Sequence, residues 1–504
     1  MKVALASEMQ EIERHTQQEY LIPASFLMER AALAVLEELK RRSGCLTGQK
    51  IYVFCGKGNN GGDGLALARF LIEKMAEVTI VLLALAEEYQ GLALENFNRA
   101  VRYGVRNIYW QDFNHLEIQS ADWIVDALLG TGSIGAPRKE YAKAIGLINS
   151  SRKRVIAMDL PSGVDSDTGK VVESAVNADC TVTFGTLKPG LIFYPGATYA
   201  GEIIVAQIGF PEKLLTQAKL KINWSLAREI KNFLPSRPVN AHKGITGHLL
   251  IVGGSSGMTG APMMASLSAL RTGAGIVTLA HQTGLELAQK PLEIITKDWT
   301  EIPWGNHNYR AVVIGPGLGT EVNAKEIFEK VCDHCFNLPV VIDADGLNLL
   351  ATHPELWGKL PNKTVLTPHL GEFSRLTGRT VVELEAKRLE AARTYASEWG
   401  VTLVLKGART IIATAEGEIF INPTGNKGMA TAGMGDLLAG MIGSLLVQGV
   451  ELAKAVVTAV YLHGFAGDLV SVKLGTIGIM ATDLLSVIPV AINKLMTEED
   501  MKNE

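Results

Sequence analysis

The chain has 504 residues, of which 47% are hydrophobic and 20% are charged, and its formal net charge is −4. Single hydrophobic cores stop growing at about 250–300 residues, so this length predicts two large domains. A charge so close to neutral excludes the basic footprint of a nucleic-acid-binding protein. No apolar run reaches the ~18 residues that suggest a membrane span, and acidic residues follow the N-terminus too soon for a secretory signal. We therefore expect a cytoplasmic protein without a membrane or nucleic-acid partner.

The five cysteines lie mostly in apolar runs, and their number is odd. Both features are typical of buried free thiols in a reducing compartment. Cys332 and Cys335 form a single Cys-x-x-Cys pair. A structural zinc site needs two more ligands, and the sequence has no second pair. We therefore interpret the cysteines as structural.

The first half alternates strand-like and helix-like segments. Residues 8–42 have helical spacing with a break near Pro23. Short apolar runs separated by helical stretches predict a mostly parallel, doubly wound sheet. The predicted strands are 51–55, 78–84, 123–129, 155–160, 180–184 and 203–208, with a helix at 65–74 after a glycine-rich loop. Residues 210–240 contain three prolines and no strand-like run, so we predict a linker at 216–230 between domains 1–215 and 231–504.

A second series of strands follows this linker, again separated by helices. The predicted strands are 248–252, 276–280, 311–314, 340–343, 364–367, 402–405 and 411–413, and the clearest helices are 437–448 and 453–472. The pattern again indicates an α/β domain.

A glycine-rich turn follows the first strand of the chain. Gly56, Gly58 and Gly61 satisfy the G-x-G-x-x-G pattern, whose backbone N–H groups bind anions. The acid that holds an NAD ribose about 20 residues later is missing, so an ordinary NAD dehydrogenase fits poorly. The run Asn59–Asp63 is more specific, because amide and carboxylate oxygens suit a monovalent cation or a ribose. The alternative is an Asx-capped turn with a purely structural role.

Two further strand ends carry similar residues, in the segments Asp126–Gly132 and Asp159–Asp165. Ligands of open α/β sheets bind outside the carboxyl ends of the strands. Three polar, glycine-rich loops at such ends therefore predict one shared cleft. The alternative for either aspartate is a helix cap.

These three segments resemble the NAD(P)H-hydrate epimerase family, over roughly residues 1–215. The resemblance implies that the hydrated nucleotide contacts Asn59, Asn60, Gly61, Gly62, Asp63, Gly130, Thr131, Gly132, Ser133, Ile134, Gly135, Ala136 and Asp159. It also implies a potassium ion held by Asn60, Asp126 and Ser162. Asp159 is expected to face the damaged nicotinamide ring as the acid/base of epimerisation. The loop after Gly132 lacks a lysine that some relatives have, so we assign no catalytic lysine.

In the second half, the segment Gly428–Gly440 enters a helix through Gly433, Met434, Gly435 and Asp436. Backbone N–H groups at a helix start stabilise phosphoryl charge. Asp436 is placed to take a proton from an attacking hydroxyl. The alternative is an ordinary N-cap aspartate beside flexible glycines.

Other strand ends of this half carry polar groups as well. Lys406–Thr410 offers two cations and a hydroxyl that suit nucleotide phosphates, although a solvated hairpin is the alternative. His369 stands between Thr-Pro and Gly-Glu, which favours a cleft position over the structural role usual for a single histidine. Glycine- or aspartate-rich turns also occur at 315–319 and 343–348.

These segments, together with 242–244, 253–255 and 260–261, resemble the ADP-dependent NAD(P)H-hydrate dehydratases over roughly residues 225–495. The resemblance implies a ribokinase-like fold after a Rossmann-like three-layer α/β/α domain. It implies that the adenine nucleotide contacts Lys406, Gly407, Ala408, Arg409, Thr410 and Gly435. It implies that the hydrated nucleotide contacts Ala261, Gly317, His369 and Asp436. Met434 replaces a Ser or Thr of many relatives, but only its backbone N–H is needed.

The combined resemblance implies a metabolite-repair enzyme with two activities. One would interconvert the R and S forms of hydrated NADH or NADPH, and the other would dehydrate the S form with ADP, releasing AMP and phosphate. Potassium and magnesium are the expected cofactors, the partners are these small molecules, and we expect a homo-oligomer. The alternatives are a small-molecule kinase of the ribokinase superfamily with a regulatory nucleotide-binding domain, and a non-catalytic nucleotide sensor.

Overall fold

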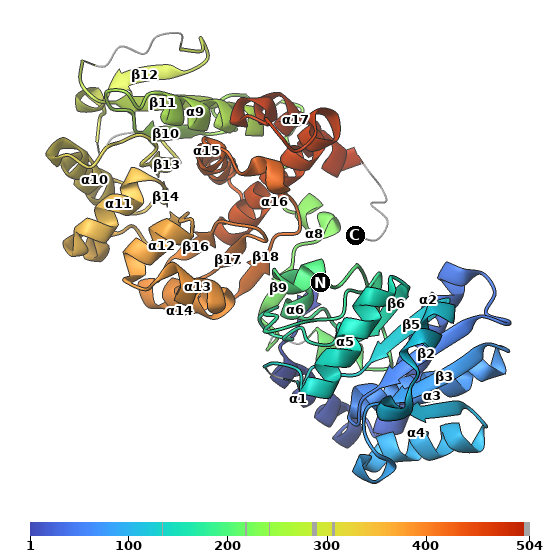
Figure 1. Cartoon of the computed structure of the whole chain (residues 1–504). Coiled ribbons are helices and arrows are strands. Elements are labelled where there is room, and N and C mark those ends of the chain that lie inside the picture. Colours follow the sequence, from blue (N-terminus) through green and yellow to red (C-terminus); the bar gives the residue numbers. More distant parts are fainter. Residues whose placement is uncertain (134, 217–218, 241, 285–289, 305–307, 498–504) are drawn as a thin grey trace. The chain divides into compact units, whose positions relative to one another are not determined.

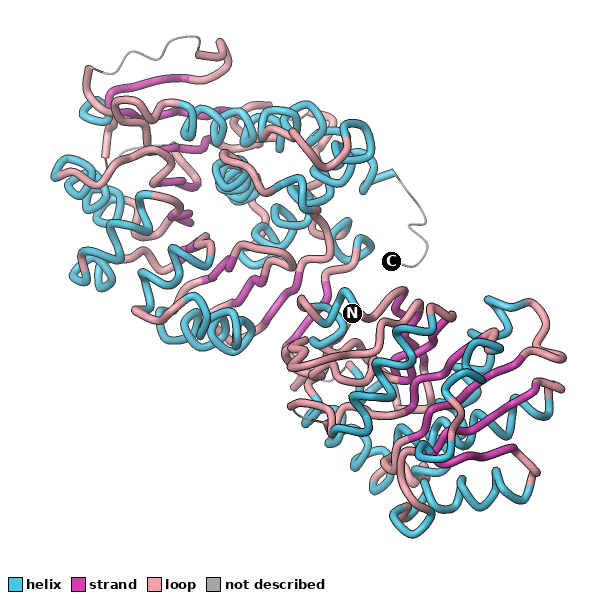
Figure 2. Tube along the Cα trace, viewed as in Figure 1, coloured by secondary structure: helices cyan, strands magenta, loops and turns pink. Residues whose placement is uncertain are grey.

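The computed structural model describes residues 1–133, 135–216, 219–240, 242–284, 290–304 and 308–497 (Figure 1). The chain divides into two compact units, residues 2–220 and residues 221–504 together with Met1. Each unit has its own mostly parallel sheet with covering helices, as the colouring by secondary structure shows (Figure 2). The α/β class predicted from the sequence is therefore confirmed for both halves.

The first unit contains a parallel sheet with the strand order β4-β3-β2-β5-β6-β7-β8. Its strands are β2 Lys50–Cys55, β3 Glu77–Leu82, β4 Arg106–Tyr109, β5 Trp123–Ala127, β6 Arg154–Met158, β7 Cys180–Phe184 and β8 Glu202–Ala206. Its longer helices are α1 Ala6–Gln18, α2 Ala24–Ser43, α3 Asn59–Glu73, α4 Gly91–Arg102 and α5 Lys139–Ser151. The six predicted strands are present, whereas β4 was not predicted.

The sheet separates two hydrophobic layers, because successive strand residues point to opposite faces. In β2, Ile51 and Val53 pack in the layer that contains α2, α3 and α4, whereas Tyr52 and Phe54 pack in the layer that contains α5. The unit is thus an α/β/α sandwich, which leaves the carboxyl ends of the strands free for loops that bind ligands.

Helix α3 begins at Asn59, so the predicted start at Leu65 is wrong. The glycines of this turn let the helix approach its neighbours closely. A Cβ on Gly61 would lie 1.8 Å from the Gly56 carbonyl oxygen, and one on Gly64 would lie 2.5 Å from the Ala127 Cβ. The polar run 59–63 is therefore the first turn of a helix, with its N–H groups directed at the sheet edge.

The second unit contains the strand order β9-β18-β17-β16-β15-β14-β13-β10-β11-β12. Strands β10 to β16 pair in parallel, and β17 is antiparallel to both of its neighbours. The strands are β9 Ile222–Trp224, β10 His248–Val252, β11 Ile276–His281, β12 Ile295–Asp298, β13 Ala311–Ile314, β14 Pro339–Ile342, β15 Lys363–Leu366, β16 Thr402–Leu405, β17 Ile411–Ala413 and β18 Ile419–Ile421.

Its helices include both that were predicted most clearly. They are α8 Ala227–Lys231, α9 Gly260–Thr272, α10 Val322–His334, α11 Asp345–Thr352, α12 Leu370–Thr377, α13 Val381–Ala386, α14 Arg388–Trp399, α15 Met434–Val447, α16 Leu452–Leu474 and α17 Ala481–Thr497. The segment predicted as a linker contains β9 and α8, and β9 pairs with β18. The expectation of no strand there is therefore wrong, because a three-residue strand leaves no recognisable apolar run.

Among the described residues, only helix α16 is long and apolar enough to meet a test for a membrane span. In its most apolar window, 67% of the residues are buried inside the structure. Such burial is typical of a core helix, and α16 packs against α15 and α17.

Candidate active sites in the two units

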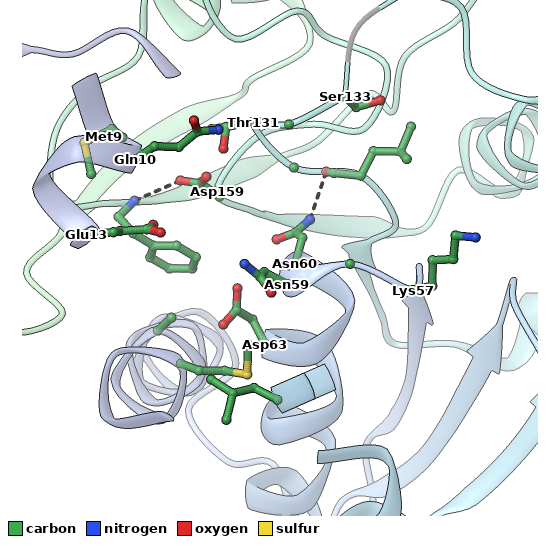
Figure 3. Close-up of a pocket in the computed structure, with 18 of the residues that line it drawn as sticks. Met9, Gln10, Glu13, Lys57, Asn59, Asn60, Asp63, Thr131, Ser133 and Asp159 are labelled. Carbon is green, nitrogen blue, oxygen red and sulfur yellow. Dashed lines mark hydrogen bonds between the residues drawn. The ribbon is translucent and has the colours of Figure 1, made fainter. Parts of the chain in front are cut away.

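A cavity of about 980 Å³ opens at the carboxyl ends of β2, β5 and β6 in the first unit (Figure 3). Most residues predicted to contact the hydrated nucleotide line it, namely Asn59, Asn60, Asp63, Gly130, Thr131, Gly132, Ser133, Ala136 and Asp159. Gly61 and Gly62 are buried within α3 and Gly135 is exposed, and none of these three lines the cavity. Ile134 lies outside the described residues. The three predicted loops therefore meet at one site.

Buried oxygen atoms from three segments gather beside this cavity. Asn60 donates a hydrogen bond from Nδ2 to the Leu129 carbonyl, at 2.9 Å, and its buried Oδ1 has no partner among the described residues. Ser162 Oγ donates to Asp126 Oδ1 at 2.6 Å and accepts from the Leu129 N–H at 2.9 Å. Burial raises the pKa of Asp126 to about 6, although hydrogen bonds from Ser162 and Leu128 lower it. These neighbouring oxygens, one of them unpaired, suit a monovalent cation.

Asp159 follows β6 and is held by a buried lysine. Its φ of +64° is rare for a residue with a side chain, and such backbone strain concentrates at functional sites. Its Oδ1 accepts hydrogen bonds from Lys188 Nζ at 2.6 Å, Thr183 Oγ1 at 3.1 Å and the Phe184 N–H at 3.2 Å. Lys188 also donates to Thr183 and to the Phe184 carbonyl, and only 1% of its surface is exposed.

Lys188 was not predicted from the sequence, in which we assigned no catalytic lysine because the loop after Gly132 lacks one. The structure instead supplies an ammonium group to the site from the segment after β7. The available signal was an isolated lysine between Leu187 and Pro189 in an otherwise apolar stretch, because lysines are almost never fully buried unless paired.

Glu13 of α1 also lines the cavity and was missed. In the sequence it resembles any charged residue on the solvent side of an amphipathic helix. Burial, followed by the negative charge of Asp159, raises the pKa of Glu13, whereas Lys188 lowers it. Burial, followed by the charges of Asp159 and Glu13, raises the pKa of Asp63 well above its usual value. Three carboxyl groups thus influence one another across this cavity.

In the second unit, charged side chains gather at the carboxyl ends of β14, β15 and β16. Lys406 Nζ lies 2.8 Å from Asp343 Oδ1 and 3.8 Å from Glu372 Oε2. Burial lowers the pKa of Lys406, but the carboxylates of Asp343 and Glu372 outweigh that effect and raise it. The Lys406 charge is therefore already shared between two buried carboxylates.

Helix α15 brings Asp436 to this cluster. Its N-cap residue, Gly433, has φ +88°, and a Cβ on Gly435 would lie 3.1 Å from Lys406 Nζ. Burial, then the charge of Asp343, raises the pKa of Asp436 to about 7, although Lys406 lowers it. A carboxyl group with this pKa is suited to accept a proton near neutral pH. The first turn of α15 adds N–H groups that favour an anion.

The residues predicted to bind the hydrated nucleotide lie at several strand ends of this unit. Gly317 follows β13 with φ +58°, where a Cβ would lie 2.3 Å from the Met258 carbonyl oxygen. Ala261 is in the first turn of α9. His369 caps α12, because its Nδ1 accepts hydrogen bonds from the N–H groups of Gly371 and Glu372. This cap assigns the ring proton to Nε2, and 56% of the side chain remains exposed.

Both cations of the predicted nucleotide loop 406–410 contact other groups of the protein. The Arg409 guanidinium donates to the Pro423 carbonyl and lies 5.2 Å from the centre of the Trp224 ring. Like Lys406, it is therefore already engaged with groups of the protein. Thr410 Oγ1 donates to the Gly407 carbonyl at 3.0 Å.

Two basic residues near this loop were missed. Arg388 of α14 donates to the Ala408 carbonyl at 3.1 Å, whereas its buried Nε and Nη2 have no partner among the described residues. His463 of α16 has a buried Nε2 without a partner within the described ranges, and burial followed by the charge of Lys406 lowers its pKa to about 4. Both lie in helices whose sequence reads as ordinary amphipathic or core helix.

The two sites share an arrangement that is typical of one class of protein. Glycine-rich loops, helix starts and acidic side chains gather at the carboxyl ends of parallel strands, as in α/β enzymes that bind nucleotides and transfer phosphate. The family model described as NAD(P)H-hydrate dehydratase matches residues 249–490, and the model described as YjeF-related protein N-terminus matches residues 24–190.

Known relatives define the family more closely. The bifunctional NAD(P)H-hydrate repair enzyme Nnr of Moorella thermoacetica is 40% identical over 519 residues, covering 99% of this chain and 98% of the relative. The chain therefore belongs to the family of bifunctional NAD(P)H-hydrate repair enzymes.

Solved structures resemble the second unit. A ribokinase-like superfamily protein from Enterococcus faecalis is 28% identical with a TM-score of 0.50, covering 55% of this chain and 96% of that chain. An ADP/ATP-dependent NAD(P)H-hydrate dehydratase from Bacillus subtilis, co-crystallised with ATP and Mg²⁺, is 31% identical with a TM-score of 0.49, covering 55% of this chain and 99% of that chain. The ribokinase-like fold predicted for the second half is confirmed.

Proposed function

We propose that this chain restores hydrated NADH and NADPH in two steps, one in each unit. The first unit interconverts the R and S forms at C6 of the nicotinamide ring. The second dehydrates the S form with ADP and releases AMP and phosphate. Family membership supports the two activities. The observation that carries the dehydratase assignment is Asp436, whose pKa is raised to about 7 in the first turn of α15.

Dehydration begins when Asp436 takes the proton of the C6 hydroxyl, whose oxygen then attacks the terminal phosphorus of ADP. AMP leaves, and the N–H groups at the start of α15 stabilise the charge of the transferred phosphoryl group. The ring nitrogen then pushes out phosphate, which is a far better leaving group than hydroxide. Loss of a proton from C5 restores the dihydronicotinamide. The net reaction converts ADP and the hydrate into AMP, phosphate and NAD(P)H.

The cofactor of this step is magnesium, which neutralises phosphate charge when it is bound. Within the described ranges, no group of three or more His, Cys, Asp or Glu side chains is arranged to hold a metal. Magnesium at a nucleotide site takes one or two protein carboxylates and completes its coordination with phosphates and water.

In the first unit, potassium would be held by Asn60, Asp126 and Ser162. The unpaired, buried Oδ1 of Asn60 supports this assignment, because buried polar atoms in native proteins almost always have a partner. Potassium supplies positive charge for the phosphates of the nucleotide. Asp159 lies in the same cavity as Asn60, and we assign it as an acid/base at C6.

We also propose a cytoplasmic location and a homo-oligomeric state. The five cysteines are all free, which supports a reducing compartment.

The test is the recovery of dihydronicotinamide absorbance when the protein meets mixed-epimer NADH hydrate with ADP, Mg²⁺ and K⁺. We expect recovery from both epimers, with one AMP and one phosphate released per NADH. Recovery of about half of the hydrate would contradict the epimerase assignment. A phosphorylated product without free phosphate would indicate a small-molecule kinase, and binding without turnover would indicate a nucleotide sensor.

A further inference from the structure

Three carboxyl groups from three different elements share the cavity of the first unit. Glu13 comes from α1, Asp63 from α3 and Asp159 from the end of β6. Figure 3 shows these side chains around the same open space. A substrate ring in that space would have carboxyl groups on more than one side, and inversion of a ring carbon involves bond breaking and bond making at both of its faces.

Among the described residues, Asp159 is the one of these three carboxyl groups that forms an ion pair with a basic side chain. Lys188 pairs with Asp159. Lys57, which also lines the cavity, forms an ion pair with Glu88, with 3.0 Å between Nζ and Oε1. Among the described residues, no hydrogen-bond donor or cation pairs with the carboxyl group of Asp63 or of Glu13. Arg138 is the remaining basic residue of the lining.

Asp63 favours the protonated state, because burial and the like charges of Asp159 and Glu13 both disfavour its ionisation. The raised pKa values of Asp63 and Glu13 agree with this geometry. Asp159, in contrast, is an ion-paired carboxylate whose Oδ1 accepts all of its hydrogen bonds within the described part of the chain. Its other oxygen is left for proton transfer. Two carboxyl groups in different environments are the usual means of separating an acid from a base.

We propose that Asp63 and Asp159 form a two-sided acid–base pair for epimerisation, acting on opposite faces of C6. This inference rests on the epimerase function proposed above. Asp63 donates its proton to the C6 hydroxyl, the C6–O bond breaks, and the lone pair of the ring nitrogen forms a C6=N bond as water departs. A water molecule then adds to the other face of C6, forming a new C6–O bond, and its proton passes to Asp159.

One turnover leaves Asp63 ionised and Asp159 protonated, which is the starting state for the reverse reaction. A further turnover in the same direction requires a proton to return to Asp63. Glu13 lines the same cavity as both groups and is the carboxyl group that we assign to relay it. Each face of C6 therefore has its own proton-transfer group.

The test separates the two faces by following ¹⁸O from labelled water into the C6 hydroxyl of each epimer, in the full-length protein. General acid–base groups contribute about 10²–10⁴-fold to rate, so we expect Asp63→Asn to slow epimerisation at least about 100-fold. Because Asp159 still acts on its own face, this variant should exchange oxygen into one epimer without inversion. Asp159→Asn should exchange oxygen into the other epimer only.

The matched control is Asp112→Asn, an exposed aspartate outside the cavity, which should epimerise at the wild-type rate. Folding of every variant is checked by its dehydration of the S epimer with ADP and by calorimetry of the first unit's unfolding. Wild-type epimerisation by Asp63→Asn would overturn the proposal, as would exchange into the same epimer by both variants or into neither. Absence of epimerisation in the unmodified protein would instead overturn the epimerase function itself.

Discussion

The buried ion pair between Lys188 and Asp159 gives a prediction for the first site. Lys188 has 1% exposure and pairs with Asp159, and removing one partner of a buried ion pair is strongly destabilising, by about 3–5 kcal/mol. We expect Lys188→Ala to lower the unfolding temperature of the first unit and to slow epimerisation about 100-fold, while dehydration of the S epimer persists. The measurement is epimerisation rate against pH.

The pH profile distinguishes positioning of Asp159 from a purely structural role for Lys188. Removing the ammonium group takes away the cation that donates a hydrogen bond to Asp159 Oδ1, so the acidic limb of the rate profile should move to higher pH. Lys143→Ala is the control, because Lys143 forms an exposed pair with Glu140, and such pairs contribute about 0–1 kcal/mol. An unshifted acidic limb in Lys188→Ala would contradict the positioning role.

Asp436 gives a residue-scale prediction for the second site. Because its pKa is raised to about 7, kcat/KM for dehydration should increase with pH up to that value, as the base loses its proton. The unfolded chain has an ordinary aspartate pKa of about 3.9 at this position, so the folded protein binds the Asp436 proton more tightly. Asp436 therefore contributes stability below a pH of about 3.9, and this contribution is lost as the pH rises to about 7. We expect Asp436→Asn to abolish dehydration and to raise the unfolding temperature of the second unit at pH 8 but not at pH 4. Equal unfolding temperatures at pH 8 would contradict the raised pKa.

Which residues could be predicted depended on their sequence context. Asn60, Asp159 and Asp436 stand beside glycines at strand ends, so the sequence alone marks them as candidates for a cleft. Lys188 and Glu13 have no such context. The first is buried by contacts with residues four to 29 positions away, and the second reaches the cavity only because α1 packs beside it. Tertiary packing of this kind leaves no local pattern in the sequence.

At the scale of elements, the start of α3 depends on glycines that permit close backbone contact. A Cβ on Gly61 would lie 1.8 Å from the Gly56 carbonyl oxygen, whereas a Cβ on Gly58 would meet nothing within 4 Å. Forcing extra atoms into a packed site costs typically about 1–3 kcal/mol or more. Gly61→Ala should therefore destabilise the first unit by at least that amount, as measured by calorimetry, and Gly58→Ala should change its unfolding by less than about 1 kcal/mol. Equal effects of the two substitutions would refute this explanation.

The strands divide into those that the sequence predicts and those that it does not. Buried parallel strands such as β5 and β13 are continuous apolar runs and were predicted. β4 and β12 are partly exposed, and β9 and β18 have only three residues that are not all buried, unlike the three of β17, so none of them forms a run that stands out. Each was missed because its pairing depends on a neighbouring strand rather than on its own hydrophobicity.

At the scale of the whole molecule, each compact unit contains a complete candidate site. Residues 2–220 supply the cavity with Asp159, and residues 221–504 supply Asp436 and its charged neighbours. No step of the proposed chemistry needs side chains from both units. The common substrate is a small molecule that can leave one site and enter the other through solution.

If the two sites work separately, two variants that each lack one activity should complement each other when mixed. Asp159→Asn alone should restore NADH only from the S epimer, and Asp436→Ala alone should restore none while still interconverting the epimers. An equimolar mixture with ADP, Mg²⁺ and K⁺ should restore the absorbance from both epimers, because hydrate inverted on one chain diffuses to the intact dehydratase of another. The assay is kept short so that spontaneous epimerisation, measured without protein, stays small. Recovery no greater than that of Asp159→Asn alone would show that the hydrate must remain on one chain between the two steps, and that the two activities are coupled.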